Sequence, residues 1–300
     1  MQLKKIHFIN YKHFDDISLD FDSSVNCIVG KNGVGKTTIL DGIYHLAFGK
    51  SYFNPVSSQN IRHGERFFMI DGEFTRDEKQ ENITVSFKVN EKKVIKRNNK
   101  AYDRLSDHIG KIGLVIISPT DQDLIKEGSD VRRKFMDGVI SQNDQNYLNT
   151  LIDYQRILSQ RNALLKYFAA NNTFQSDTLS VYDQQLVDLG DQIFSKRSEF
   201  IDHYAPLLSE RYKTISGNNE DVTVKYQSQL EKENFSYLLK DRQQKDMRFQ
   251  YTSVGVHKDD LSLKLNGYPI KKFGSQGQQK SYLIALKFAQ YDFMLNQKKV

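Results

Sequence analysis

Apolar and polar residues alternate along much of the first hundred residues, the pattern of strands with one buried face. The alternation covers residues 3–9 and 17–21, and it returns from Phe67 in FFMIDGEF, NITVSFKVN and KKVIKRN. Two short runs, residues 27–29 and 113–117, are apolar at every position. Such runs are typical of strands buried on both faces. The pattern predicts antiparallel strands beside two buried strands.

Helical spacing begins at residue 37, where apolar residues recur every three or four positions through residue 48. Residues 130 to about 214 are mostly helical in pattern, interrupted by an Asn-, Ser-, Thr- and Gln-rich loop at 169–178. Strand-like runs at 222–226, 249–254 and 261–265 precede a last helix from 280 to about 295. These changes predict three segments, 1–128, 129–250 and 251–300.

A phosphate-binding loop lies between the first buried run and the first helix. Residues 30–37, GKNGVGKT, match the pattern G-x-x-x-x-G-K-[ST] in the strand-to-helix context that it requires. Its backbone N–H groups would wrap the phosphates of ATP, Lys36 would reach the β- and γ-phosphates, and Thr37 would ligate Mg²⁺. The alternative is a glycine turn without a ligand. The predicted nucleotide-binding residues are Gly30, Lys31, Asn32, Gly33, Val34, Gly35, Lys36, Thr37 and Thr38.

A second candidate anion site precedes the last helix. Ser275, Gln276, Gly277 and Gln278 place a hydroxyl and free backbone N–H groups at a positive helix end. Taken alone, an ordinary helix cap is the favoured interpretation. Because the same chain also contains a phosphate-binding loop, an anion site becomes the favoured interpretation.

Composition adds a weak indication of a polyanionic partner. Lys and Arg number 43 against 37 Asp and Glu, a net charge of +6, which many proteins without such a partner share. For each basic cluster by itself, a solvated face is favoured over DNA contact. The clusters are Lys92, Lys93, Lys96, Arg97 and Lys100; Arg132, Arg133 and Lys134; and Lys271 and Lys272.

The single cysteine, Cys27, cannot form an internal disulfide, and its apolar neighbours favour a buried structural thiol. No His and Cys residues have zinc-site spacing. The chain shows neither a signal peptide nor an apolar run long enough to span a bilayer. We therefore expect a cytoplasmic protein without a membrane partner.

Taken together, the motifs resemble the RecF family of bacterial recombination-mediator ATPases, which belongs to the ABC-type superfamily. The resemblance extends over the whole chain in family order. It includes the start LKKIHFINYKHFDDISLDF, the phosphate-binding loop, PTDQDLIKEGSDVRRKFMD at 119–137, the helical segments QRNALLK and YDQQLVDLGDQI, GVHKDDL at 255–261 and SQGQQK at 275–280. The chain departs from the family pattern at Thr120, Asp130, Val256 and Lys258.

The resemblance implies an α/β fold, a P-loop ABC-type ATPase head with an antiparallel β layer and an inserted helical lobe. It implies that Ser275–Gln278 of one copy closes over ATP held by another, in an ATP-dependent homodimer that clamps duplex DNA near single-strand/double-strand junctions. It also implies RecO- and RecR-type partners, recombinase loading and weak DNA-stimulated ATPase activity. Because Thr120 replaces a family acid, Asp121 or Gln122 is the candidate sensor of Mg²⁺ and γ-phosphate.

The family carries an acidic strand beyond the signature helix, and this strand holds Mg²⁺ and polarises the attacking water. Here the sequence stops at Val300, where that strand should begin, so we expect a truncated chain with no catalytic residues, which binds ATP and hydrolyses it poorly. The alternatives are an SMC-type head, the nucleotide-binding subunit of a transporter, and a non-enzymatic interaction module. The absence of a long heptad insertion disfavours the first, and the SQGQQK motif disfavours the second.

Overall fold

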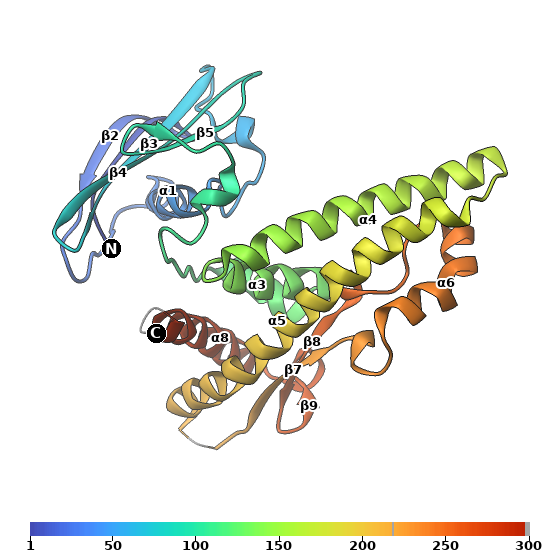
Figure 1. Cartoon of the computed structure of the whole chain (residues 1–300). Helices are drawn as coiled ribbons and strands as arrows, with labels where there is room; N and C mark the ends of the chain where they lie inside the picture. Colours follow the sequence, from blue (N-terminus) through green and yellow to red (C-terminus); the bar gives the residue numbers. More distant parts are fainter. Residues whose placement is uncertain (218, 298–300) are drawn as a thin grey trace. The chain divides into compact units, whose positions relative to one another are not determined.

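The computed structural model describes residues 1–217 and 219–297, and the chain forms two compact units that divide between Leu114 and Val115 (Figure 1). Each unit has its own hydrophobic core. The three predicted segments, 1–128, 129–250 and 251–300, stay a prediction. Val300, where we expected an acidic strand to begin, lies outside the described residues.

The first unit is a six-stranded antiparallel sheet with one long helix packed on it. Strand order is β2-β1-β3-β4-β5-β6, and helix α1 follows the phosphate-binding loop (Figure 1). Short 3-10 turns lie at Ser57–Asn60 and Leu105–His108. The elements are β1 (Gln2–Tyr11), β2 (Phe14–Asp20), α1 (Lys36–Phe48), β3 (Phe67–Arg76), β4 (Lys79–Lys88), β5 (Val94–Arg97) and β6 (Lys100–Ala101).

Strand register explains the core of this unit. Phe8 of β1 lies opposite Ile70 of β3, Ile70 opposite Val85 of β4, and Val85 opposite Ile95 of β5. All four side chains are buried and form one apolar row across the sheet. Helix α1 approaches so closely that a Cβ at Gly42 would lie 2.1 Å from the Phe8 ring. Helix α1 is thereby fixed on the sheet, and with it the loop from which the helix starts.

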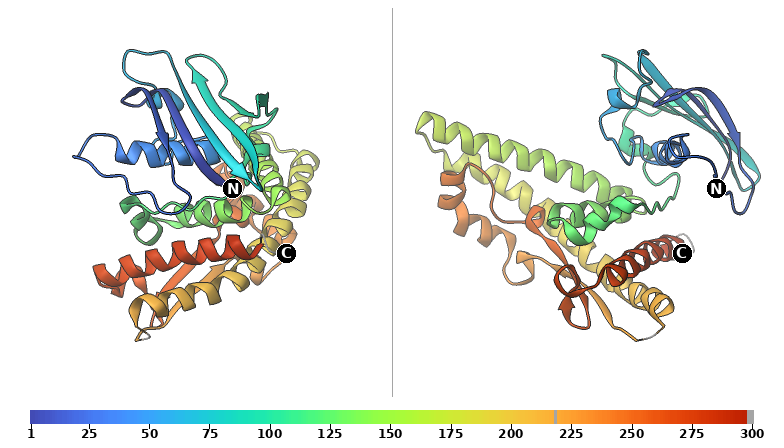
Figure 2. Two further views of the ribbon diagram at one scale, coloured as in Figure 1. Left: turned by 90° about the vertical axis from the view of Figure 1, so that its left-hand side faces the viewer. Right: turned by 180° about the vertical axis from the view of Figure 1, so that it is seen from behind.

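The second unit is mainly helical, with a small antiparallel sheet of order β7-β8-β9. Its long helices α4 and α5 run side by side in opposite directions (Figures 1 and 2). The 3-10 turns are Pro119–Gln122, Gln229–Glu231 and Val256–Lys258. The helices and strands are α2 (Asp123–Lys126), α3 (Ser129–Ser141), α4 (Gln145–Asn171), α5 (Ser176–Ser216), β7 (Val222–Gln227), α6 (Phe235–Phe249), β8 (Asp260–Leu265), β9 (Tyr268–Pro269), α7 (Ile270–Phe273) and α8 (Gln276–Gln297).

Helix α5 organises the core of the second unit, because α4, α6, α8 and β7 all pack against it. Its buried residues recur at helical spacing, as at Ile193, Phe200, Tyr204 and Leu208. Tyr204 donates a hydrogen bond from its hydroxyl to the carbonyl of Leu286 in α8, at 2.6 Å. The buried polar tip of this tyrosine is thus satisfied by the helix that begins at the candidate signature motif.

Most predicted elements are confirmed. Strands β1 to β5, β7 and β8, helix α1 and the helical stretch α3 to α5 lie where the hydrophobic periodicity placed them. The last helix, α8, begins at Gln276, four residues earlier than predicted. Helix α6 is not among the predicted elements.

The two predicted buried strands are wrong, since neither 27–29 nor 113–117 forms a strand. Val29 is 87% exposed, and Cys27 is exposed rather than a buried structural thiol. A strand satisfies its backbone through a neighbouring strand, and within the described residues no strand pairs with either run. An apolar run therefore does not suffice to form a strand.

The strand predicted at 249–254 is also wrong. Helix α6 extends to Phe249, and Gln250 ends it with a left-handed φ of 60°. Thr252 N–H then donates to Asn162 Oδ1, and Ser253 N–H donates to Asp246 Oδ1. These side-chain acceptors take the place of a strand partner.

Candidate nucleotide site

The phosphate-binding loop ends at an uncapped helix start. Gly35, the N-cap of α1, has a left-handed φ of 104°, no side chain caps the helix, and its first turn contains no acidic residue. The first backbone N–H groups of α1 are therefore available to an anion and carry the positive end of the helix dipole. Lys36 Nζ donates to the carbonyl oxygens of Gly30 at 2.8 Å and Lys31 at 2.7 Å. The arrangement suits a polyphosphate, whose oxygens would replace those carbonyls as acceptors.

The turn between β1 and β2 packs against this loop. A Cβ at Gly35 would lie 2.3 Å from His13 Nε2 and 2.5 Å from the Phe14 ring, so no larger residue fits without displacing that turn. Lys12, in the same turn, has a left-handed φ of 55°. The aromatic-basic turn and the phosphate-binding loop are therefore neighbours in space, which sequence order did not indicate.

Asp41 joins the same turn to α1, and our sequence reasoning missed it. It is fully buried and accepts hydrogen bonds from the Tyr11 and Ser51 hydroxyls at 2.7 Å each, while Lys12 Nζ lies 2.6 Å away. Burial raises the pKa of this carboxyl, but the donors from Lys12, Tyr11 and Ser51 outweigh burial and hold the pKa below its usual value. The available signal was an acidic residue among the apolar positions of the predicted helix.

The candidate signature residues form a reciprocal helix cap. Gln278 N–H donates to Ser275 Oγ at 3.2 Å, and Ser275 N–H donates to Gln278 Oε1 at 2.7 Å. The amide nitrogen of Gln278 also donates to Glu220. Ser275, Gln276 and Gly277 are exposed. The start of α8 is consequently a capped, exposed helix end in which Ser275 Oγ still has acceptor capacity.

The two candidate sensor residues lie in different environments. Asp121 is buried; its Oδ2 accepts from Ser118 N–H at 2.6 Å and its Oδ1 lies 2.8 Å from Lys287 Nζ in α8. Gln122 is exposed and uses only its Oε1, as acceptor from Lys126. The geometry assigns Asp121 a structural contact and leaves the Gln122 amide nitrogen accessible.

The predicted DNA-binding cluster divides into paired and exposed members. Arg97 makes a bidentate ion pair with Glu81, at 2.7 and 3.0 Å, and Lys93 Nζ donates to the Gly49 carbonyl at 2.6 Å. Burial lowers the pKa of the Lys93 ammonium. The exposed members, on and beside β5 and β6, are Lys92, Lys96 and Lys100.

The other motifs with family resemblance meet in a buried ion network. Arg197 of α5 is 2% exposed and donates to both oxygens of Asp137 at 3.0 Å, to Asp259 Oδ2 at 3.0 Å and to the Val256 carbonyl at 2.7 Å. This guanidinium joins the segments 119–137 and 255–261, which lie far apart in sequence. Their role is to hold α3, α5 and the start of β8 together.

The arginine cluster at 132–134 belongs to the same connection. Arg132 makes a bidentate pair with Asp260, at 2.6 and 2.9 Å, and Arg133 donates to the Asp259 carbonyl at 2.7 Å. Lys134 pairs with Asp130 within α3. These side chains are engaged within the second unit, whereas Lys271 and Lys272 are exposed.

His257, whose role the sequence left open, is a partly buried hydrogen-bonding residue. Its Nε2 lies 3.0 Å from the Thr252 carbonyl and must carry the proton, so that Nδ1 accepts from the Tyr154 hydroxyl at 2.8 Å. Burial lowers its pKa to about 4. The imidazole therefore stays neutral in the folded protein at neutral pH.

This shifted pKa predicts an acid-dependent loss of stability. The unfolded chain takes up a proton on His257 near pH 6.5 and the folded protein only near pH 4, so stability should fall as the pH drops between these values, by up to about 3 kcal/mol. Urea unfolding of the protein and of His257→Gln across pH 4–8 measures the effect. The two profiles should converge toward low pH, because only the wild-type chain loses the contribution of His257. Burial also lowers the pKa of His45 and His108, but both proteins share that effect and it cancels in the comparison. Parallel profiles would contradict the assignment.

Within residues 1–217 and 219–297, no helix has both the length and the apolar character needed to cross a membrane. The same residues contain no group of three or more His, Cys, Asp or Glu side chains arranged to hold a metal ion.

Comparison with known proteins identifies the family. A family model described as an AAA domain matches residues 5–250. The DNA replication and repair protein RecF of Flavobacterium johnsoniae is 56% identical over 300 residues, which is all of this chain and 84% of that protein. RecF of Phocaeicola vulgatus is 46% identical over 295 residues, covering 98% of this chain and 79% of that protein.

A solved structure agrees with the sequence relatives. The recombination mediator protein RecF of the RecFOR pathway, solved with ATP, has a TM-score of 0.94 and 30% identity, covering 99% of this chain and 82% of that chain. The P-loop ATPase head with mixed α/β structure and a helical lobe is thereby confirmed. The chain belongs to the RecF family of DNA replication and recombinational repair proteins.

Proposed function

We propose that the protein binds ATP on residues 30–38 and that ATP joins two copies. Each site would combine the phosphate-binding loop of one copy with Ser275–Gln278 of the other. The observation that carries this proposal is the uncapped start of α1, where Lys36 and free N–H groups surround a glycine loop. The exposed start of α8 supports the second half of the site.

Magnesium would accompany ATP, with the Thr37 hydroxyl as its ligand from the chain. Of the two sensor candidates, Gln122 is the better one for the γ-phosphate, because its amide nitrogen is accessible as a donor while both oxygens of Asp121 are occupied. The acidic residues that complete the site in the superfamily lie, by resemblance, beyond the signature helix. By resemblance, we expect the protein to bind ATP and to have a weak, DNA-stimulated ATPase activity.

ATP would act as a switch for DNA binding. Contacts from Ser275–Gln278 to the γ-phosphate can form only in the closed dimer, so ATP favours that dimer and ADP does not. The closed dimer would clamp duplex DNA near junctions with single strands and assist recombinase loading. RecO- and RecR-type proteins are the proposed partners, since the solved relative belongs to the RecFOR pathway.

Mixing two inactive variants tests the composite site. Lys36→Ala should lose ATP-driven dimerisation through its own loop, and Ser275→Arg should lose it through a blocked signature while still binding ATP. Mixed together, they can form one intact site per dimer, so ATP should restore a heterodimer in sedimentation velocity experiments. Gln297→Arg, at the far end of α8, is the control. The proposal would be overturned if ATP produced a dimer neither in the mixture nor in the wild-type chain.

The exposed lysines beside β5 give a separate test of DNA contact. Changing Lys92, Lys96 and Lys100 to Glu should weaken duplex binding and reduce the slope of log K against log salt by about 3, one for each lost phosphate contact. The equal charge change at Lys166, Lys213 and Lys240, which are exposed and belong to none of the basic clusters, is the control. An unchanged salt slope would remove this cluster from the interface.

A further inference from the structure

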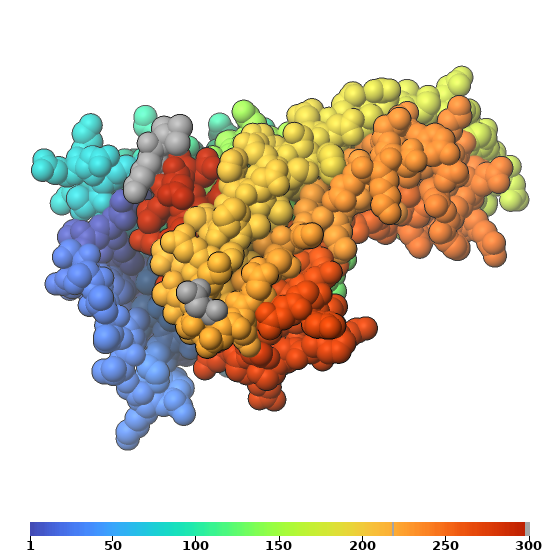
Figure 3. All heavy atoms as spheres, turned by 90° about the horizontal axis from the view of Figure 1, so that it is seen from below, coloured from blue at the N-terminus to red at the C-terminus, as the bar shows by residue number. Residues whose placement is uncertain are grey.

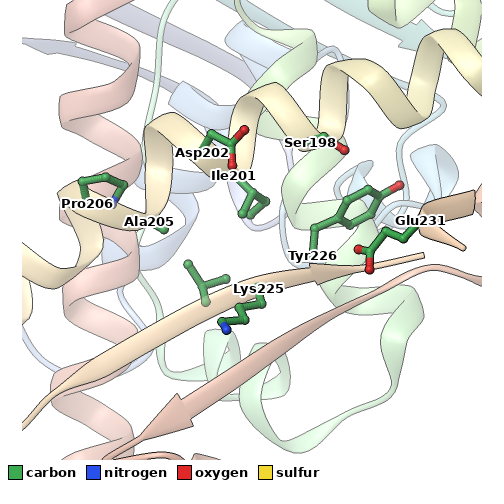
Figure 4. A pocket seen from close by; sticks show the side chains of 9 residues that line it. Ser198, Ile201, Asp202, Ala205, Pro206, Lys225, Tyr226 and Glu231 are labelled. Carbon is green, nitrogen blue, oxygen red and sulfur yellow. The ribbon is translucent and has the colours of Figure 1, made fainter. Parts of the chain in front are cut away.

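Two surfaces of the second unit differ in charge. In the hollow between α5 and β7, which has a volume of 470 Å³, Lys225 is accompanied by the carboxylates of Asp202 and Glu231 (Figure 4). That hollow therefore carries no excess of positive charge. The end of α6 and the segment after it do carry such an excess, and α6 lies at the surface of the unit (orange in Figure 3).

Two aromatic rings lie nearly parallel at the end of α6. Phe249 is the last residue of the helix and Tyr251 follows two positions later. Their ring centroids are 5.7 Å apart and their planes differ by 14°. The two side chains are 43% and 45% exposed, so both rings are accessible to a ligand. We use the name α6 platform for these two rings together with Lys245, Arg248 and Lys258.

The cations of the α6 platform surround the rings. Lys245 Nζ lies 5.7 Å from the centre of the Phe249 ring, and Lys258 Nζ lies 5.0 Å from the centre of the Tyr251 ring. Arg248 is exposed and lies three residues after Lys245, on the same side of the helix. In the part of the chain that the structure describes, none of these three cations forms an ion pair with a carboxylate.

The nearby carboxylates are bound by other residues. Residues 241–260 contain four acidic side chains, and each of them pairs with an arginine outside the α6 platform. These acids are Asp241, Asp246, Asp259 and Asp260. The positive charge of the platform is therefore not neutralised by its neighbours and attracts a polyanion.

The backbone beside Tyr251 is anchored by side chains beneath it. The N–H and the hydroxyl of Thr252 both donate to Asn162 Oδ1, at 2.7 Å each. The N–H and the hydroxyl of Ser253 donate to Asp246 Oδ1, at 2.9 and 2.6 Å. The ring pair thus lies between a helix end and an anchored segment, so a ligand that stacks on it orders little additional backbone.

A ligand that uses the whole platform needs both a flat aromatic group and negative charge. Single-stranded DNA has both, because each nucleotide carries a base with an open face and a phosphate. A base stacked on Tyr251 would displace the Lys258 ammonium, which would then bind a neighbouring phosphate. In duplex DNA the base faces are already stacked on one another, and an acidic peptide would leave the rings uncovered.

We propose that the α6 platform binds single-stranded DNA, with a base stacked on the Phe249 and Tyr251 rings and phosphates bound by Lys245, Arg248 and Lys258. The platform shares no residue with the nucleotide site, the signature residues or the lysines beside β5. Binding of a single strand to it therefore requires neither ATP nor a dimer. It would give the protein a contact to the single-stranded side of a junction.

The probe is a fluorescein-labelled oligothymidylate of about 12 nucleotides, titrated with the protein without ATP and followed by fluorescence anisotropy. Tyr251→Leu keeps an apolar side chain but removes the ring, so the affinity should fall by at least about fivefold, the effect of one lost base stack. Tyr251→Phe keeps the ring and should bind as the wild-type chain does. Tyr237→Leu is the matched control, because Tyr237 is an exposed ring at the start of the same helix.

Two further ligands separate stacking from charge. A strand of the same length that lacks its bases keeps every phosphate, and it should bind at least about fivefold more weakly than the oligothymidylate. Its affinity should be the same for Tyr251→Leu and for the wild-type chain. A duplex of the same length should also not distinguish these two proteins, because its bases are not available for stacking.

The salt dependence tests the phosphate contacts. Changing Lys245, Arg248 and Lys258 to Gln should reduce the slope of log K against log salt for the oligothymidylate by about 2, since each phosphate contact on a single strand contributes about 0.7. The control neutralises three other exposed lysines of the second unit, Lys213, Lys232 and Lys240. Thermal unfolding of every variant shows that the protein is folded.

Three results would overturn the proposal. Equal oligothymidylate binding by folded Tyr251→Leu and the wild-type chain would show that no base stacks on the platform. Equal binding of the strand without bases would show that the protein recognises charge alone. If a labelled oligoglutamate binds more tightly than the oligothymidylate and loses affinity in Tyr251→Leu, the platform is instead a site for an acidic peptide.

Discussion

Lys36→Ala should raise the dissociation constant for ATP by about 100-fold, equivalent to about 2.7 kcal/mol. Lys36 supplies a charge-assisted donor at the loop, and in the structure this ammonium is held by two loop carbonyls, those of Gly30 and Lys31. Its loss removes the only side-chain cation that the loop pattern directs toward the β- and γ-phosphates. Titration with a fluorescent ATP analogue, with thermal unfolding of the same samples, measures affinity and folding together.

Lys31→Ala is the matched control, because it removes the same charge from the same loop at an exposed position. It should change the affinity by less than about threefold, as expected for a screened surface charge. An unchanged affinity in Lys36→Ala, with the protein folded, would remove the nucleotide site from residues 30–38.

Arg197→Met should lower the free energy of unfolding by about 3–5 kcal/mol. The substitution leaves the carboxylates of Asp137 and Asp259 without their shared cation in a buried site and leaves the Val256 carbonyl without a donor. Loss of one partner destabilises the protein by more than the whole ion network stabilises it, because an uncompensated buried charge is highly unfavourable. Chemical denaturation followed by circular dichroism gives the value.

Arg156→Met provides the comparison on the surface of α4. Arg156 is 58% exposed and pairs with Asp153 three residues earlier, so its loss should cost less than about 1 kcal/mol. Combining Arg197→Met with Asp137→Asn and Asp259→Asn should recover part of the lost stability. Equal effects at Arg197 and Arg156 would show that the buried network does not connect the two motifs energetically.

Features that depend on neighbouring residues in sequence were predictable. The phosphate-binding loop, the start of α1 and the alternation in β1 to β4 each follow from spacing within a short window. The structure of the runs at 27–29 and 113–117 was not predictable, because a strand depends on a partner strand that composition does not specify. The strand predicted at 249–254 was wrong for a related reason, since the side chains of Asn162 and Asp246 accept the backbone N–H groups that a partner strand would otherwise bind.

The candidate site shows the same division. The sequence pattern predicts a nucleotide site at Gly30 to Thr38, but the division of the basic cluster into paired and exposed members depends on Glu81, 16 residues from Arg97. Likewise, the segments at 119–137 and 255–261 could be recognised by resemblance, yet their structural role required Arg197. Long-range pairing of charges is therefore what the single sequence could not supply.

The contact of His13 and Phe14 with Gly35 makes nucleotide binding observable by spectroscopy. The chain contains no tryptophan. A single indole introduced as His13→Trp would be the sole emitter in its spectral range and would lie directly on the phosphate-binding loop. Any rearrangement of Gly35 around a triphosphate would then change the emission of that indole, which gives a signal for each binding and release event without a labelled nucleotide.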